Sequence, residues 1–180
     1  MTPIGHAAVS VLAGQAGRRL PLWALVLGGV LPDADYVFMR FDFFVGIHRV
    51  VTHNLAFAFA AGLLAAGIAR EEKGWAALAA FAGVVLHNLV DSVMDTNTAN
   101  GVGVALFWPF SGWMFSPFNL APGMAHEERL PDLWTMVRRL PWALKWEVPV
   151  WLLAGWLWLR GRGPLDVLPA GREAHGPDHG

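Results

Sequence analysis

Runs of apolar residues alternate with short polar breaks along most of the chain. The runs cover residues 4–16, 20–31, 55–69, 75–90 and 142–159. Runs of this length and composition predict helices. Pro32 follows the second run, and Pro141 is expected in the first turn of the last helix. The sequence therefore predicts an all-α fold.

The lengths of the runs indicate how they relate to a lipid bilayer. At ~1.5 Å per residue, each of the first two covers roughly 20 Å, less than the ~30 Å hydrocarbon core, so we expect a short hairpin that does not fully span. Runs 55–69 and 75–90, with their polar ends included, are near the spanning length. Segment 36–46 is rich in aromatic residues and suits an interfacial loop or short helix, and segment 103–117 suits a re-entrant or interfacial piece. This pattern predicts a polytopic membrane helical bundle with short or re-entrant helices.

Composition agrees with a membrane location. Hydrophobic residues make up 55% of the chain, charged residues make up 15%, and the mean hydropathy is +0.42. Soluble domains rarely carry so much apolar surface. Tryptophans near the ends of the runs are interpreted as anchors at the lipid headgroups: Trp75, Trp142, Trp156 and Trp158.

Charge and cysteine usage narrow the possible partners. The net charge of −1 gives no basic surface for nucleic acid, so no nucleic acid partner is expected. Membrane lipids are the expected partners. The chain has no cysteine, so any metal ion must be held by nitrogen and oxygen atoms.

One domain is expected over residues 1–160. The start of the chain lacks the positive region of a cleavable signal peptide, so we expect it to be retained. Residues 161–180 are rich in glycine and proline and have too little apolar content to pack, which predicts a disordered polar tail.

Histidines and aspartates gather at the ends of the apolar runs. If consecutive helices alternate in direction, these residues all lie at one face of the bundle, whereas the breaks at the other face contain neither residue type. On a helix, His87 and Asp91 project from the same side because they are four residues apart. The candidate metal ligands are His6, Asp33, Asp35, His48, His53, His87 and Asp91.

This donor set is sufficient for two divalent ions with positions left for water. A bound divalent ion activates water near neutral pH. Asp91 is the candidate to bridge two ions. Asp35 is also predicted to be a catalytic residue. Arg49 is expected to stabilise negative charge on a phosphoryl group, while Thr52 and Asn54 are expected to orient the ligands.

Structural readings of the same residues stay open. His6 alone can be a polar residue near the chain start, Asp33 and Asp35 can cap a turn, and His87 with Asp91 can form a structural hydrogen bond. Asp95 continues the helical spacing but is interpreted as a helix-end residue. His126 lies outside the constellation.

The order of these motifs resembles the YdjM-like, LexA-regulated, membrane-bound metal-dependent hydrolases. This chain has Val50 and Asn54 where that family usually has glycine and serine. The resemblance covers roughly the first 120 residues and implies a metal-dependent hydrolase of the bacterial inner membrane, distantly similar to zinc-dependent phospholipase C and the S1/P1 nucleases. It makes two zinc ions the expected cofactor, with Mn, Fe or Mg as alternatives. The motifs are Gly5-His6, Leu31-Pro32-Asp33-Ala34-Asp35, His48-Arg49-Val50-Val51-Thr52-His53, His87-Asn88-Leu89-Val90-Asp91 and Phe107-Trp108-Pro109-Phe110.

The expected function is hydrolysis of a phosphoester, in a lipid or lipid-linked substrate, by metal-activated water. Two other readings stay open: a metal-binding transporter or scaffold without enzymatic activity, and a metal-dependent amidase or peptidase. The distribution of positive residues favours, by a narrow margin, a multi-pass arrangement with the site on the extracytoplasmic face.

Overall fold

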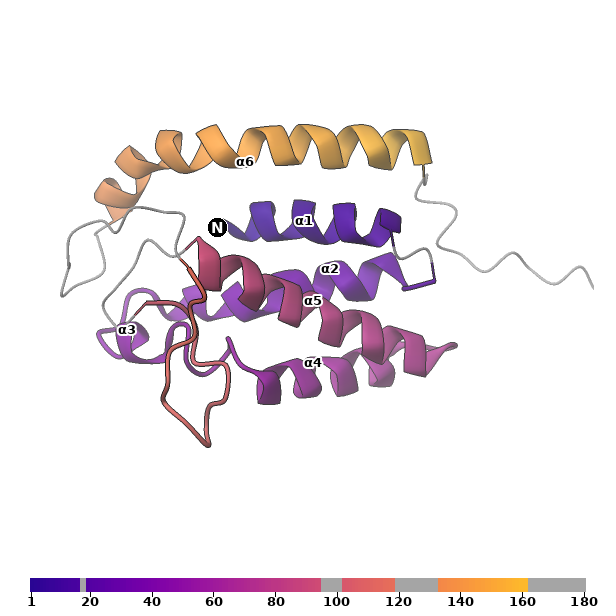
Figure 1. The fold of residues 1–180 in the computed structure, drawn as a ribbon, viewed down its shortest axis with the longest axis horizontal. Coiled ribbons are helices and arrows are strands. Elements are labelled where there is room, and N and C mark those ends of the chain that lie inside the picture. The colour runs from indigo at the N-terminus through magenta and orange to yellow at the C-terminus, as the bar shows by residue number, and fades with distance from the viewer. Residues whose placement is uncertain (17–18, 95–101, 119–132, 162–180) are drawn as a thin grey trace, which may run out of the picture.

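A computed structural model describes residues 1–16, 19–94, 102–118 and 133–161. Helices account for the regular secondary structure of these described residues, which agrees with the predicted all-α class (Figure 1). The elements in order are α1 (Pro3–Ala16), α2 (Leu22–Val30), the 3-10 helix η1 (Leu31–Phe38), α3 (Phe44–Ile47), α4 (Leu55–Ile68), α5 (Lys73–Val93) and α6 (Leu133–Gly161).

Helix α5 lies at the centre of the bundle. It packs against α2 on one side and α4 on the other, while α1 packs against α2, and α6 covers α1 (Figure 1). The buried core between α2, α4 and α5 consists mainly of alanine, with Leu25 as its largest member. Small side chains of this kind let helix backbones approach closely.

Glycines set the closest approach between α2 and α5. A Cβ atom added at Gly28 would lie 2.0 Å from the carbonyl oxygen of Ala80, and one at Gly83 would lie 2.3 Å from that of Leu25. Real Cβ atoms do not approach backbone atoms so closely. The sequence positions of these glycines therefore fix how deeply α5 sits against α2.

By length and composition, α5 is the helix of the described chain that can cross a membrane, with 21 residues. Helix α4 has 14 residues, about 21 Å at ~1.5 Å per residue, and falls short of the ~30 Å hydrocarbon core. The sequence interpretation extended this helix with polar residues at its ends. The helix instead begins at Leu55 and ends at Ile68. Asn54 caps its first turn by accepting a hydrogen bond from the Phe57 N–H at 2.7 Å.

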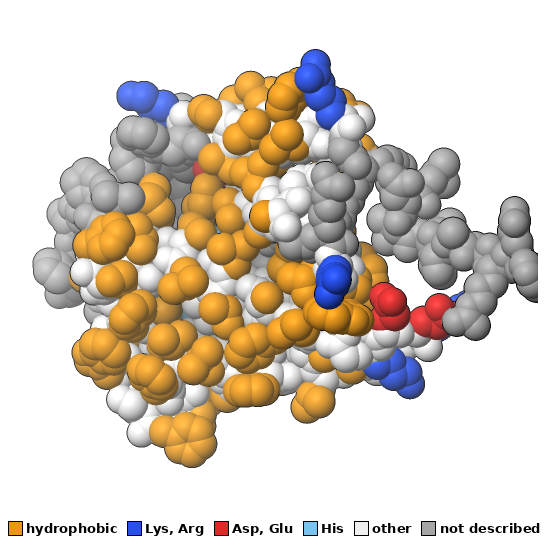
Figure 2. All heavy atoms as spheres, turned by 45° about the vertical axis from the view of Figure 1, so that its right-hand side comes forward, with side chains coloured by type: hydrophobic (Ala, Val, Ile, Leu, Met, Phe, Trp, Pro, Cys, Tyr) orange, Lys and Arg blue, Asp and Glu red, His pale blue; other side chains and the backbone are white. Residues whose placement is uncertain are grey.

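Large apolar side chains remain on the outer surface of the bundle. Figure 2 shows them spread over one face of the molecule, with charged side chains near its margins. On α4 they include Phe59 and Leu63, which are 65% and 75% exposed, and on α6 they include Leu152 and Leu159. Such a surface is typical of helices that contact lipid.

Two segments differ from, or refine, the sequence prediction. Helix α6 begins at Leu133, so Pro141 lies inside it and not in its first turn. The residues before Pro141 include leucine, methionine and arginine, which are strong helix formers and extend the helix in that direction.

Segment 103–117 is irregular and is closed by a pair of hydrogen bonds between Val104 and Phe115. Asp95, His126 and the tail 162–180 lie outside the described residues.

Candidate metal centre

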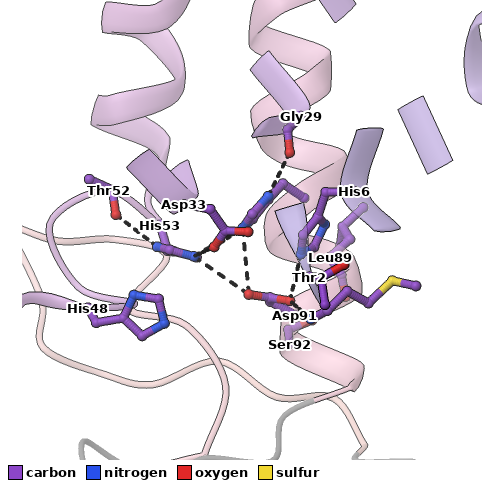
Figure 3. Close-up of polar contacts among 12 residues, drawn as sticks. Thr2, His6, Gly29, Asp33, His48, Thr52, His53, Leu89, Asp91 and Ser92 are labelled. Carbon is purple, nitrogen blue, oxygen red and sulfur yellow. Dashed lines mark hydrogen bonds and ion pairs between the residues drawn. The ribbon is translucent and has the colours of Figure 1, made fainter. Parts of the chain in front are cut away.

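The structure brings the predicted ligand residues together at one end of the bundle. Figure 3 labels His6, Asp33, His48, His53 and Asp91 among them. They come from the first turns of α1, from η1, from the loop between α3 and α4, and from the last turns of α5. Each is 5% exposed or less: His6, Asp33, Asp35, His48, His53, His87 and Asp91. Ionisable groups buried this deeply are costly unless they are paired or hold an ion.

Four of these residues surround one point. The Nε2 atoms of His53 and His87 are 3.0 Å apart. The Asp33 Oδ1 atom lies 3.8 Å and 3.7 Å from these two nitrogens, and the Asp91 Oδ2 atom lies 3.6 Å and 3.5 Å from them. Donors placed ~2.0 Å from a zinc ion at the corners of a tetrahedron are ~3.3 Å apart. The separations around the two imidazoles fit a tetrahedrally coordinated metal ion held by this group.

The hydrogen bonds of the two imidazoles turn their Nε2 lone pairs toward that point. His87 Nδ1 lies 2.8 Å from the carbonyl oxygen of Gly29, which can only accept, so Nδ1 carries the hydrogen. Thr52 has one hydroxyl hydrogen and donates it to Asp35 Oδ2 at 3.1 Å, so it accepts from His53 Nδ1 at 2.9 Å. In neutral rings both Nε2 atoms are then acceptors. Two acceptors 3.0 Å apart repel each other unless a proton or a metal ion lies between them.

Asp33 fits the same ion. Its Oδ2 atom is buried without a hydrogen bond partner among the described residues, while Oδ1 faces the two histidines. An orphaned carboxylate oxygen of this kind is costly without a cation nearby. The donor set of two imidazoles and two carboxylates is also one that zinc accepts.

A second group contains Asp35, His48 and, again, His53. Both oxygens of Asp35 lie 3.1 Å from His48 Nδ1. The separation of Asp33 from Asp35 follows from η1. In a 3-10 helix with three residues per turn, side chains two positions apart point in different directions. The two aspartates therefore serve different groups.

His6 lies beside the first group without belonging to it. Its ring stacks on His87 with centroids 3.6 Å apart, and its Nε2 atom lies 3.1 Å from Asp91 Oδ1. The Met1 amino nitrogen lies 3.0 Å from the same oxygen. Asp91 thus directs its two oxygens to different partners, whereas the residue shared by the two groups is His53.

The residues predicted to assist the ligands have distinct places. Arg49 is 7% exposed and adopts a left-handed backbone with φ of 65°, a strained conformation outside glycine. Asn54 contacts backbone atoms: its Nδ2 atom donates to the carbonyls of Val50 and Val51 at 2.7 and 2.8 Å. Asn54 therefore stabilises the loop before α4, while Thr52 contacts the predicted ligands Asp35 and His53 directly.

Burial dominates the electrostatics of the site. It raises the pKa of Asp33 from 3.8 to about 6, against the opposing effect of nearby His87. It also lowers the pKa of His53 to about 3, so this imidazole is neutral at physiological pH. A neutral imidazole is the form that binds metal.

Two contacts at the site were missed from the sequence. The carbonyl of Gly29 orients His87, and Glu147 of α6 is buried against Thr2 at the start of α1. A backbone carbonyl gives no sequence signal. Glu147 did give one, because an acidic residue within an apolar helix is rare and generally has a partner.

Comparison with known proteins identifies relatives of the chain. The family profile described as YdjM inner membrane protein matches residues 1–162. The chain is 32% identical over 174 residues to the inner membrane protein YbcI of Escherichia coli (strain K12), covering 89% of this chain and 99% of that protein. No solved structure matches the chain. The chain belongs to the YdjM family of inner membrane proteins.

Proposed function

We propose that this inner membrane protein is a metal-dependent hydrolase that cleaves a phosphoester of a lipid or lipid-linked substrate. The observation that carries the proposal is the convergence of the His53 and His87 Nε2 atoms, 3.0 Å apart and flanked by two carboxylates. A divalent ion held there supplies charge stabilisation and an activated water near neutral pH.

The proposed cofactor is zinc, with one ion held by each group. The first group supplies Asp33, His53, His87 and Asp91, and the second supplies Asp35, His48 and the shared His53. A first group with four nitrogen and oxygen donors favours zinc over Mn or Mg, which prefer octahedral surroundings.

The protein's own residues then have separate roles. Asp91 directs one oxygen to the first group and the other to His6, so it is proposed to couple the two sides of the site. Asp35 holds the hydrogens of His48 and Thr52 and is proposed to fix their orientation during the reaction. The Arg49 guanidinium is proposed to stabilise negative charge on the phosphoryl group.

Exposed aromatic residues near the site support a lipid substrate. The loop that carries Arg49 is joined to segment 102–118, because the Ala105 N–H donates to the Arg49 carbonyl at 3.0 Å. Phe110 on this segment is 94% exposed. Further exposed aromatic residues on this segment and on the segment before α3 are Phe38, Phe41, Phe43, Phe107 and Trp113. Aromatic side chains are enriched where proteins meet lipid headgroups.

A metal-stabilised membrane protein without enzymatic activity is the second candidate. The first group already supplies four protein donors, which is the number typical of a closed structural zinc site. A metal-dependent amidase or peptidase is the third, since an activated water also attacks carbonyl carbons. Substrate assays separate these three functions.

The test uses the full chain purified in detergent. Bound zinc is measured, and hydrolysis of phospholipids, a soluble phosphodiester and a peptide amide is followed with and without chelator. We expect chelator-sensitive phosphoester hydrolysis by the native protein and loss of both metal and activity in His87→Ala. Glu71→Gln, an exposed carboxylate before α5, is the matched control. Zinc binding without any hydrolysis would support the structural role, and cleavage of the amide alone would support the peptidase.

A further inference from the structure

A buried carboxylate on α6 contacts the beginning of α1. Glu147 is 2% exposed, whereas its neighbour Val148 and the following Leu152 lie on the outside of the same helix. The Thr2 N–H donates to Glu147 Oε1 at 2.7 Å, and the Thr2 hydroxyl donates to Oε2. Both carboxylate oxygens of Glu147 therefore accept hydrogen bonds from Thr2.

Thr2 is also the residue that caps α1. Its hydroxyl oxygen accepts a hydrogen bond from the Gly5 N–H at 3.2 Å, and its carbonyl accepts one from the His6 N–H at 3.1 Å. The first turn of a helix has unsatisfied N–H groups and a partial positive charge, and a carboxylate beside it is favourable. Glu147 thus fixes the residue from which the first turn begins.

The glycine before His6 makes room for this contact. A Cβ atom at Gly5 would lie 2.6 Å from Glu147 Oε2 and 2.9 Å from its carboxyl carbon. A side chain at this position would force Glu147 away from Thr2. In the Gly5-His6 pair, the glycine leaves room for the Glu147 carboxylate, and the histidine contacts the proposed metal ligands.

His6 is the next side chain of this turn to reach the metal centre. It stacks on His87 and lies 3.1 Å from Asp91 Oδ1, so a shift of the first turn of α1 moves a ring in contact with two proposed ligands. We propose that Glu147 is a positioning residue for the metal centre, acting through Thr2 to hold His6 against Asp91. The inference rests on the metal centre of the proposed function but is independent of the reaction it catalyses.

A double-mutant cycle tests this inference. The zinc dissociation constant is measured by chelator competition on the full chain in detergent for Glu147→Met, His6→Ala and the double variant. Outer residues that position a metal ligand typically change metal affinity by about 10–100-fold. We expect each single variant to weaken zinc binding by about tenfold or more. Because Glu147 acts through His6, adding Glu147→Met to His6→Ala should change affinity less than about twofold.

Further variants separate positioning from simple anchoring of α6. Thr2→Val should behave as Glu147→Met does, and Thr2→Ser, which keeps the hydroxyl, should restore native affinity. The visible spectrum of the cobalt-substituted protein should change in Glu147→Met and Thr2→Val and stay native in Leu152→Met, an exposed position on α6.

Two results would overturn the inference. Additive effects of His6→Ala and Glu147→Met on affinity would show that Glu147 does not act through His6. Glu147→Met with a lower melting temperature but native zinc affinity and cobalt spectrum would make Glu147 an anchor only. If the native protein binds neither zinc nor cobalt, the proposed metal centre is wrong, and the inference about Glu147 fails with it. The two results above differ from this one because in them the native protein binds metal.

Discussion

Thr52 connects the two groups of the metal centre through a single hydroxyl. Its hydrogen goes to Asp35 Oδ2, and its lone pair receives the Nδ1 hydrogen of His53. The same residue thus fixes the tautomer of His53 and one oxygen of Asp35. Gly29 does the equivalent for His87 with a backbone carbonyl. Of these two orienting groups, only the threonine can be altered by a simple substitution.

Thr52→Val removes the hydroxyl with little change in volume. We expect zinc affinity to fall by about 10–100-fold, because His53 loses the acceptor that directs its Nε2 lone pair to the ion. Chelator competition measures the change, and Thr52→Ser is the matched control that keeps the hydroxyl. Native affinity in Thr52→Val would show that the ring is held by packing alone.

Zinc binding should depend on pH through Asp33. Burial raises the pKa of this carboxyl to about 6, so below that pH the ion must displace a proton. Protonation of Asp33 should therefore lower affinity by about tenfold for each pH unit below 6. His53, with a pKa of about 3, stays neutral throughout this range. Titration between pH 5 and 8 measures the slope, and Asp33→Asn should bind more weakly with a reduced slope.

At the scale of elements, the contact between α2 and α5 sets the position of the site. Gly83 lies in this contact, and a Cβ atom there would meet the Gly29 nitrogen at 2.7 Å as well as the Leu25 carbonyl. Gly29 is also the residue whose carbonyl orients His87. Packing of these helices and orientation of a ligand therefore depend on the same few atoms.

Gly83→Ala is expected to destabilise the fold by about 1–3 kcal/mol through overpacking. It should also weaken zinc binding, because the displaced Gly29 no longer holds His87. Gly74→Ala is the control on the same helix: a Cβ atom there meets nothing within 4 Å, so it should not lower the stability of the fold. Thermal unfolding in detergent compares the two. An equal stability of both variants would contradict the close approach of α2 and α5.

The positions of the elements were only partly predictable from the sequence. Apolar runs locate α1, α2, α4 and α5 because composition changes sharply at their ends. The division of Asp33 and Asp35 between two groups depends on the 3-10 geometry of η1, which the motif does not specify. Glu147 reaches Thr2 because α6 packs on α1, and its partner is 145 residues away in the chain. Contacts between elements so distant in sequence have no local signal.

At the scale of the whole molecule, the site lies at the end of α5 that is opposite the α4–α5 connection. The sequence predicted this convergence from alternating helix directions alone. Because α5 is long enough to cross the membrane, its two ends should face opposite sides. The native chain has no cysteine, so single cysteines can report on each side.

Phe110→Cys reports on the site end, and Glu71→Cys reports on the other. We expect a membrane-impermeant maleimide to label Phe110→Cys in intact cells with a permeable outer envelope, and Glu71→Cys only after the inner membrane is opened. The reverse pattern would place the site on the cytoplasmic face. Labelling of both from one side would mean that α5 does not cross the membrane.

His53 belongs to both candidate groups, and this affects how metal would be counted. One Nε2 atom cannot serve two ions fully, so an ion in the first group leaves the second with Asp35 and His48 as its own donors. We therefore expect successive loading, with about one zinc ion per protein after dialysis and a second only at higher free zinc. A single measurement of metal stoichiometry would then depend on how the sample was washed, whereas a full binding isotherm would show two steps.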